Sequence, residues 1–421
     1  MSVMNIHAGR MQTAGEAALL DLYTARMGAL PGNPDVASAR DLAIDALRTQ
    51  GLPTRRIESW HYTDLRSLLR ALPEGGASAG KTEPLVAGAS VLVLEDGAAL
   101  GGKAPDGVTV SHIAAKLEDG SFAKALTQRG FDDTIGQINT ALVSDGYHLA
   151  IAGGIDLAKP LEIQIEAGAG SHTRLAVNMG QNSKATIIER HAGGDAFVSA
   201  VTNLVLGDGA DLVWIIDQER GPSAVQFGQF NAWIGKDAKL TLFVMNAGGK
   251  LVRQEVHVAV KGEGSDFKLR GINLVGGDAH IDVTMTLTHE VENTTSTEVI
   301  RNVITGRGRG VFQGQIKVFP GAQKTDAKMA CNTLLLSDEG EFSAKPELEI
   351  FADDVACGHG ATVREVEPQH LFYLMARGIP EPVARGLLVK AFVAEIIEEL
   401  ENEALVEALE ERLADWLEAQ A

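Results

Sequence analysis

GDGADLVWIID (207–217) and GKDAKLTLFVM (235–245) each begin with a short turn and continue as apolar residues that alternate with polar or β-branched ones. Such alternation is typical of a strand in a half-buried sheet. The turns NSKA (182–185) and GEGSDF (262–267) introduce similar runs. The runs start at Ala185, Leu212, Leu240 and Phe267. The intervals between successive starts differ by no more than a single position, which predicts stacked units of nearly equal length.

A second series of turns has a slightly longer period. Ile281, Val311 and Phe342 follow GGDAH, GRGRG and DEGE, again at nearly equal intervals. A period of a few tens of residues, with short strands and almost no helix, predicts a mainly β fold, a solenoid of coiled strands. A β-sandwich also has regular short strands, but the long strand-rich region contains no obvious hairpin dipeptide. We therefore favour a parallel β-helix.

Helical patterns flank the strand-rich region. Apolar residues at helical spacing run through 1–71, and residues 85–150 are mixed. EPQHLFYLMARG (367–378) has Pro368 near its start and Gly378 at its end, the usual helix punctuation, and an acidic amphipathic region follows it. The predicted organisation is a helical and mixed region over 1–150, a β-helix core over 151–363 and a helical region over 364–421. We expect the helices to cap both ends of the core.

The charge and cysteine content narrow the classes of function. The 421 residues carry a formal net charge of −19, from 37 basic and 56 acidic side chains, which disfavours binding to nucleic acid or to a membrane surface. The longest apolar runs, such as VLVL (91–94), are too short to span a bilayer. The start of the chain shows no secretory signal, and two cysteines cannot form a disulfide framework. We expect a cytoplasmic protein with reduced thiols.

FADDVACGHGATV (351–363) is the best candidate for chemistry. Cys357 and His359 lie two places apart, so in a strand they project on the same face, and glycines flank the histidine. The pair can present two ligands to a metal or cluster, or the histidine can activate the thiol as a nucleophile or sulfur acceptor. A buried cysteine beside a hydrogen-bonded histidine explains the spacing slightly better than either of these sites. Cys331 precedes Cys357 by close to one coil, so the two sulfurs can lie on neighbouring strands unless the register is offset.

The supply of ligands limits any cluster site. An iron–sulfur cluster usually takes four protein ligands, mostly thiolates. The chain has two cysteines and no CxxC. A complete cluster site within one subunit is therefore not expected, and such a site must be shared with a partner.

GGASAGKT (75–82) matches the phosphate-binding loop letter for letter. Such a loop follows a strand and opens a helix, whereas this one follows a helical pattern and precedes Pro84 and a strand-like run. We interpret it as a linker. The other histidines are scattered without HxH or HExxH spacing, so we expect them to be structural or exposed.

Three segments and the region between them carry a family resemblance. GLPTRRIESWHYTDL (51–65), the strand-rich middle, EIFADDVACGHGATV (349–363) and QHLFYLMARGIPEPVARGLLVKAFVAEII (369–397) occur in that order. Together they resemble the SufB/SufD family of iron–sulfur cluster assembly proteins over essentially the whole chain, in the SufD form at the histidine motif. The resemblance implies a right-handed parallel β-helix between helical regions, and a scaffold subunit of the SUF system rather than an enzyme.

The resemblance also implies partners. They are SufB, paired through the β-helix, and the SufC ATPase, docked on the C-terminal helices, with sulfur relayed from a cysteine desulfurase system. The isolated chain can also pair with itself. No cofactor is expected to be tightly bound in the isolated chain, and a transient iron–sulfur cluster is expected in the complex.

The same resemblance assigns roles to residues. His359 matches a histidine at the SufB–SufD interface, which makes it a metal ligand shared with the partner, and Cys357 is its neighbour. Cys331 falls where SufB-type chains carry a cluster-linked cysteine. The residues that match the SufC-docking region are His370, Phe372, Tyr373, Met375, Arg377, Gly378, Ile379 and Pro380.

Two other functions remain open at this point. One is a thiol-dependent sulfur transferase that uses Cys357 as acceptor. The other is a polysaccharide-active β-helix enzyme, for which the secretory signal is missing.

Overall fold

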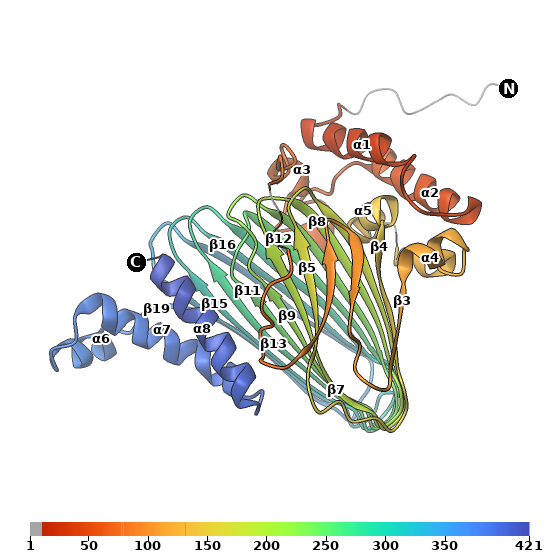
Figure 1. Ribbon diagram of the computed structural model, residues 1–421. Helices are drawn as coiled ribbons and strands as arrows, with labels where there is room; N and C mark the ends of the chain where they lie inside the picture. The colour runs from red at the N-terminus through yellow and green to blue at the C-terminus, as the bar shows by residue number, and fades with distance from the viewer. Residues whose placement is uncertain (1–10, 77, 79, 131, 421) are drawn as a thin grey trace.

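The computed structural model describes residues 11–76, 78, 80–130 and 132–420. Its central body is a parallel β-solenoid in which the chain passes alternately between two facing sheets (Figure 1). We call the ten-stranded sheet, which holds most odd-numbered strands, sheet A, and the nine-stranded sheet, which holds most even-numbered strands, sheet B. The mainly β solenoid predicted from the turn spacing is confirmed.

The strands of sheet A, in spatial order, are β19 (Ala356–Glu365), β17 (Asp326–Leu335), β15 (Thr295–Ile304), β13 (Asp266–Val275), β11 (Lys239–Asn246), β9 (Asp211–Gln218), β7 (Lys184–Gly193), β5 (Leu161–Ala167), β1 (Ser90–Glu95) and β2 (Ala98–Gly102). Those of sheet B are β18 (Glu341–Ile350), β16 (Arg309–Val318), β14 (His280–His289), β12 (Leu251–Val260), β10 (Val225–Ile234), β8 (Phe197–Leu206), β6 (Ser171–Met179), β4 (Asp145–Ile151) and β3 (Val108–His112).

The two ends of the solenoid differ. At the N-terminal end β2 and β3 close the sheets with antiparallel pairing. At the other end β18 and β19 pair in parallel with β16 and β17, and no described strand lies beyond either of them. This second end, the open end, leaves two strand edges without a neighbour in the described chain.

The predicted register holds in sheet A. Ala185, Leu212, Leu240 and Phe267 are direct partners on successive strands. In sheet B the column that begins at Ile281 continues to Gly310 and Phe342, so the choice of Val311 was wrong by a single position. The inward position belongs to a glycine because a Cβ there would lie 2.9 Å from Ile304 Cδ1 and 3.0 Å from Phe342 Cδ2.

The space between the sheets is mostly apolar, with one polar row along it. Inward side chains such as Ile187, Trp214, Leu242 and Phe312 form the main core. Asparagines on successive strands of sheet A form a ladder. Asn246 Nδ2 donates to Asn273 Oδ1 at 2.8 Å, and Asn273 Nδ2 donates to Asn302 Oδ1 at 2.8 Å. Asn302 Nδ2 then donates to Thr333 Oγ1 at 3.0 Å. Each asparagine amide thus donates a hydrogen bond to a buried polar side chain on the next coil.

The N-terminal helices cover the outer face of sheet B (Figure 1). They and the short helices near them are α1 (Ala14–Arg26), α2 (Pro34–Gln50), η1 (Glu58–Trp60), α3 (Leu65–Leu68), α4 (Ile113–Glu118), η2 (Ala123–Leu126) and α5 (Thr134–Leu142). Leu19, Ile44 and Ile138 pack with the outward Phe197 and Phe227 of sheet B.

A buried charge cluster fastens the segment around η1 to sheet B. Arg253 is fully buried and pairs with Asp282, and its Nε donates to Glu255 Oε1 at 2.9 Å. The Arg253 guanidinium lies 3.8 Å from the ring centroid of Trp60. Thr63 Oγ1 donates to Asp282. Burial alone would raise the pKa of Glu255, but Arg253 and His257 lower it to about 2. The cluster is held by mutual charge compensation in a site closed to water.

The C-terminal helices are α6 (Pro368–Met375), α7 (Glu381–Glu398) and α8 (Glu403–Ala419). α7 and α8 lie on the outer face of sheet A, where Phe392, Val393 and Trp416 pack with outward Phe243 and Ile272. The ion pairs Arg270–Glu399 (2.6 Å) and Arg301–Glu395 (2.7 Å) reinforce this contact. The expectation that these helices cap the solenoid's end is therefore wrong. They cover the apolar outer face of sheet A, and the end stays open.

The linker around GGASAGKT is tied to sheet A. Ala77 and Ala79 lie outside the described residues. Thr82 N donates to Gln164 Oε1 at 3.1 Å, and Leu85 N donates to Glu162 Oε2 at 2.6 Å. The next regular element is the strand β1, so no helix follows to bind phosphate in the manner of a phosphate-binding loop.

Candidate functional site

Cys357 and His359 lie in β19, the edge strand of sheet A at the open end. Cys357 is the register partner of Ala327, and His359 is the partner of Met329. Ala327 and Met329 belong to the inward core, so the cysteine and the histidine also lie on the inward side of the sheet. Cys357 is half-buried against that core, whereas His359 is exposed because no described strand covers it.

Cys331 lies on the neighbouring strand but away from Cys357. Its register partner in β19 is Ala361, four positions beyond Cys357, because this coil is longer than the separation of the two cysteines. Four positions along a strand correspond to about 13 Å. The two sulfurs share the inward side without forming a pair of neighbours.

The thiols differ in exposure, and both are poor candidates for a nucleophile. Burial raises the pKa of Cys331 to about 12, although Asn302 Nδ2 donates a hydrogen bond to its sulfur at 3.4 Å. Burial also raises the pKa of Cys357; a hydrogen bond with the Ala327 backbone lowers it in part, and the Asp326 carboxylate raises it. Because the thiolate is the reactive form, this environment disfavours the sulfur-transferase interpretation.

Glu298 is a residue of this region that the sequence analysis missed. It occupies the same inward column as Met329 and His359, on β15. Its side chain is fully buried. Burial raises its pKa to about 8, so the carboxyl is mostly protonated at neutral pH. The sequence did contain a sign of this placement. In TSTEVIRNVI (295–304), Glu298 lies two positions before the inward Ile300, so both side chains project on the same face of the strand.

The other histidines were expected to be structural or exposed, and several of them are buried and hydrogen-bonded. His172, His191, His280 and His289 are buried, and each has a ring nitrogen within hydrogen-bonding distance of a side-chain oxygen. In the described part of the chain, no group of three or more histidine, cysteine, aspartate or glutamate side chains is arranged to hold a metal ion. The inward side of β19 therefore offers a partial ligand set.

The residues predicted to dock an ATPase lie on and just after α6. Phe372, Tyr373 and Met375 are exposed, with 73% of Phe372 accessible to solvent. The side chains of α7 that follow, Val383 and Leu387, are also exposed. α6 has no buried residue. We call these five side chains the α6–α7 apolar surface.

The turn between α6 and α7 is well defined. Gly378 has φ +84°, a conformation that favours glycine, and Pro380 is the N-cap of α7. Arg377 stacks on Tyr373 with its guanidinium 3.4 Å from the ring centroid. His370 lies on α6 and is exposed, and Ile379 lies in the turn before α7.

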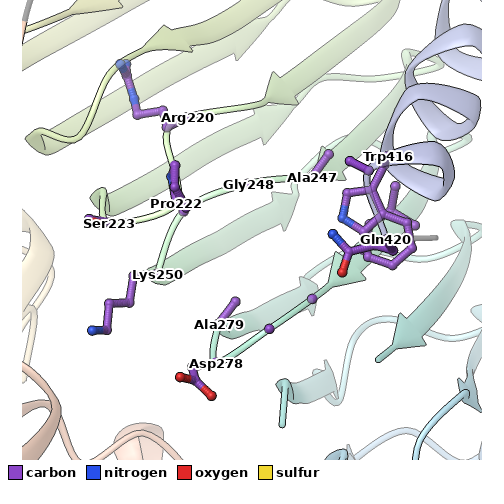
Figure 2. Close-up of a pocket in the computed structure, with 15 residues that line it drawn as sticks. Arg220, Pro222, Ser223, Ala247, Gly248, Lys250, Asp278, Ala279, Trp416 and Gln420 are labelled. Atoms are coloured by element: carbon purple, nitrogen blue, oxygen red, sulfur yellow. The ribbon is translucent and has the colours of Figure 1, made fainter. Parts of the chain in front are cut away.

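A separate hollow lies where the end of α8 meets two glycine-rich turns (Figure 2). Arg220 and Lys250 point away from Trp416 and Gln420 in this view. A Cβ at Gly276 would lie 2.6 Å from Gln420 Oε1, so the glycine allows the helix end to approach. Asp278 is the one carboxylate among its described lining residues, and no cysteine or histidine lines it. We interpret the hollow as a packing seam.

Comparison with known proteins agrees with this architecture. Residues 163–392, more than half of the chain, match the family model described as "SUF system FeS cluster assembly, SufBD core domain". The chain belongs to the SufBD family. The matched residues run from β5 through the open end to α7, so they include every predicted site residue.

Individual relatives of this SufBD-family chain are similar over most of their length. The iron–sulfur cluster assembly protein SufD of Escherichia coli is 29% identical over 388 residues, which cover 88% of this chain and 90% of the relative. A SufBD family protein of Synechocystis is 26% identical, with 87% of each chain covered. One from Mycobacterium tuberculosis is 27% identical, with 86% and 89% covered. The predicted membership of the SufB/SufD family is confirmed, and the chain is similar to SufD itself.

No helix in the described part of this SufBD-family chain is both long and apolar enough to cross a membrane.

Proposed function

We propose that this chain is a scaffold subunit that pairs with a SufB-type partner through the open end of its solenoid and helps to hold a nascent iron–sulfur cluster there. The cluster is the cargo of the complex rather than a resident cofactor. The observation that carries the proposal is the coincidence, at one strand, of an unpaired sheet edge and the Cys357–His359 pair.

The free edges explain how a partner is held. β18 and β19 present backbone N–H and C=O groups that have no strand partner in the described chain. Natural proteins usually cover or break such edges, and an added strand from another chain satisfies the same groups. A partner solenoid that adds one strand to each sheet would continue both ladders and close the open end.

The ligand count explains why the site is shared. A strand added next to β19 would lie about 4.8 Å from it, so its inward side chains would be direct neighbours of His359. His359 is exposed and chemically suited to bind iron. Since the chain supplies only two cysteines, one of them buried with a raised pKa, most of the cluster's ligands would come from the partner.

The α6–α7 apolar surface supports a second contact, with a SufC-type ATPase. Its large apolar side chains are exposed on both sides of a glycine turn, and α7, which carries Val383 and Leu387, packs on sheet A. Exposed apolar patches of this kind mark interaction sites. ATP binding and hydrolysis would belong to that partner, and this subunit would transmit the movement to the solenoid.

The test is anaerobic co-purification of this chain with SufB and SufC, with His359→Ala as the variant and His61→Ala, another exposed histidine, as its matched control. We expect His359→Ala to assemble normally and to lose most of the visible absorption of the cluster, while His61→Ala keeps it. A full cluster signal in His359→Ala, or a stable stoichiometric cluster on the isolated wild-type chain, would contradict the proposal.

The ATPase contact has its own variant. Phe372→Ser combined with Val383→Ser should abolish co-purification of SufC and leave SufB bound, because the two surfaces are on different parts of the fold. Loss of SufB with retention of SufC would show that the surfaces have been assigned the wrong way round.

A further inference from the structure

A pocket of about 430 Å³ lies on the outer face of sheet B, away from the open end. Its floor is formed by outward residues of β6, β8 and β10, and its roof by the segment from Lys124 to Arg129 and the start of α5. This volume is within the range of small-molecule sites, roughly 300–1,000 Å³. Nothing in cluster assembly by the open end or the α6–α7 apolar surface makes use of it.

The lining of the pocket is positively charged in a chain of net charge −19. It contains Lys124, Arg129 and Arg174, with Asp133 as the one carboxylate among the described lining residues. Asp133 is occupied by neutral donors. Its Oδ1 accepts from Gly136 N at 2.9 Å and from Gln229 Nε2 at 2.7 Å. The pocket therefore has an excess of cations.

The two arginines have only neutral acceptors for their guanidinium groups within the described chain. Arg129 Nη1 donates to Asn231 Oδ1 at 3.2 Å. Arg174 donates to Asn139 Oδ1, Ala125 O and Thr140 Oγ1, each at 2.7 Å. A guanidinium without a carboxylate partner keeps its affinity for an anion.

Burial increases the energetic cost of the excess positive charge beside the pocket. Only 3% of Arg174 is exposed, and burial lowers its pKa to about 10; the nearby Asp133 carboxylate raises the pKa in part, and the neighbouring Arg40 lowers it. Arg40 is itself buried and donates only to backbone carbonyls. Placing more cations than anions out of water is unfavourable, and Asp133 alone does not balance these arginines. An anion bound in the pocket would offset this cost.

The rim of the pocket is aromatic. Trp233 lines it and remains 36% exposed, although large aromatic side chains are usually well buried. Its register partner Val205, on the neighbouring strand, is also exposed. An indole beside guanidinium groups is suited to stack with a flat ring.

We propose that this pocket binds a small organic anion that carries a flat ring. The anionic group lies toward Arg129 and Arg174, and the ring lies against Trp233. Mononucleotides and aromatic carboxylates share this chemistry, so the test must separate them.

The test is calorimetric titration of the full chain with four probes: AMP, indole-3-acetate, adenosine and inorganic phosphate. Adenosine lacks the anion and inorganic phosphate lacks the ring. We expect both to bind at least about tenfold more weakly than the tighter of the first two, because charge-assisted hydrogen bonds and stacking are both needed. The order of AMP and indole-3-acetate then identifies the anionic group.

Variants locate the site. Arg129→Gln and Trp233→Leu should each weaken the tighter probe at least about tenfold, and Arg129→Lys should restore part of the affinity. Arg56→Gln, at another exposed arginine, should change it less than twofold. Arg129 and Trp233 are partly exposed, so their melting temperatures should stay near that of the wild type. Absence of saturable binding by all four probes, equal binding of adenosine, or wild-type affinity in both variants would overturn the proposal.

Discussion

Replacing Arg253 by methionine should destabilise the protein strongly at neutral pH and much less in mild acid. Arg253 is fully buried between Asp282 and Glu255 and stacks on Trp60. Methionine fills a similar volume but removes the positive charge that bonds both carboxylates directly. Breaking a buried ion pair by removing one partner costs about 3–5 kcal/mol.

This cost can be converted to a shift in melting temperature. Unfolding entropy is about 2.1 cal/mol/K per residue, so for 421 residues it is roughly 0.9 kcal/mol/K. If the solenoid and its docked helices melt together, Arg253→Met should lower the melting temperature by about 3 to 6 °C at pH 7. Scanning calorimetry of both proteins at pH 7 and pH 5 measures the shift.

The pH dependence follows from the carboxylates. In the wild type the folded pKa of Glu255 is lowered to about 2, so its stabilising contribution is present above the unfolded value of about 4.3 and is constant between pH 5 and 7. Without Arg253, burial raises the folded pKa of Glu255. The folded variant then binds more protons than the unfolded one and gains stability as the pH falls. The deficit should therefore shrink at pH 5.

The control is Arg307→Met, which removes an exposed ion pair with Asp278 and should shift the melting temperature by less than about 1 °C. A deficit in Arg253→Met no larger than that of the control at pH 7, or one that grows at pH 5, would refute the reasoning.

Three further outcomes follow from the interior of the solenoid. Asn273→Leu should destabilise by about 2–4 kcal/mol in denaturant titrations, because it leaves Asn246 Nδ2 and Asn302 Oδ1 buried without that partner. An Asn273→Leu variant with the same free energy of unfolding as the wild type would contradict the ladder. Glu298→Gln should raise the melting temperature relative to the wild type, and more at pH 8 than at pH 5. The folded pKa of Glu298 is raised to about 8, so its contribution is favourable below the unfolded pKa and is lost as the pH rises toward 8. A larger gain at pH 5 would contradict this sign. Iodoacetamide at pH 8 should label Cys357 in the native protein and leave Cys331 unmodified until unfolding, as read by peptide mass spectrometry. Equal labelling rates would show that Cys331 is accessible.

The stacking of the coils could be predicted from the sequence because turns and the first inward apolar residue recur together. This worked where the inward position is filled by a side chain, as at Leu212 and Leu240. It failed at Gly310, where a Cβ would crowd the side chains of Ile304 and Phe342, so the next residue, Val311, carried the apolar signal. A glycine that is required by close packing has no apolar side chain, so a pattern of hydrophobic residues does not reveal its inward position.

The sequence also indicated where the C-terminal helices pack, but a search for alternating apolar and polar residues does not detect this signal. In LTLFVM the residues Leu242 and Val244 point inward, whereas Phe243 and Met245 point outward. A strand that is apolar on both faces must be covered on both. Such continuous runs mark where α7 and α8 pack.

The candidate site was predicted only in part. Cys357 and His359 were found because their spacing and composition are local features. Glu298 was not, since its position in the column of His359 depends on two coils of different length. The separation of the cysteines has the same origin, because Cys357 falls four positions short of Ala361, the register partner of Cys331.

The uninterrupted register has a consequence for how this chain can change in length. Each strand of sheet A from β7 to β19 meets its neighbour without a slip. Loss or gain of a whole coil would join the same columns again and preserve the interior. Loss or gain of a single residue within a strand would turn every side chain beyond it to the opposite side. Inherited length differences in the solenoid should therefore come in steps of one coil or fall in the turns, and the open end would keep its chemistry while its distance from the N-terminal helices changes.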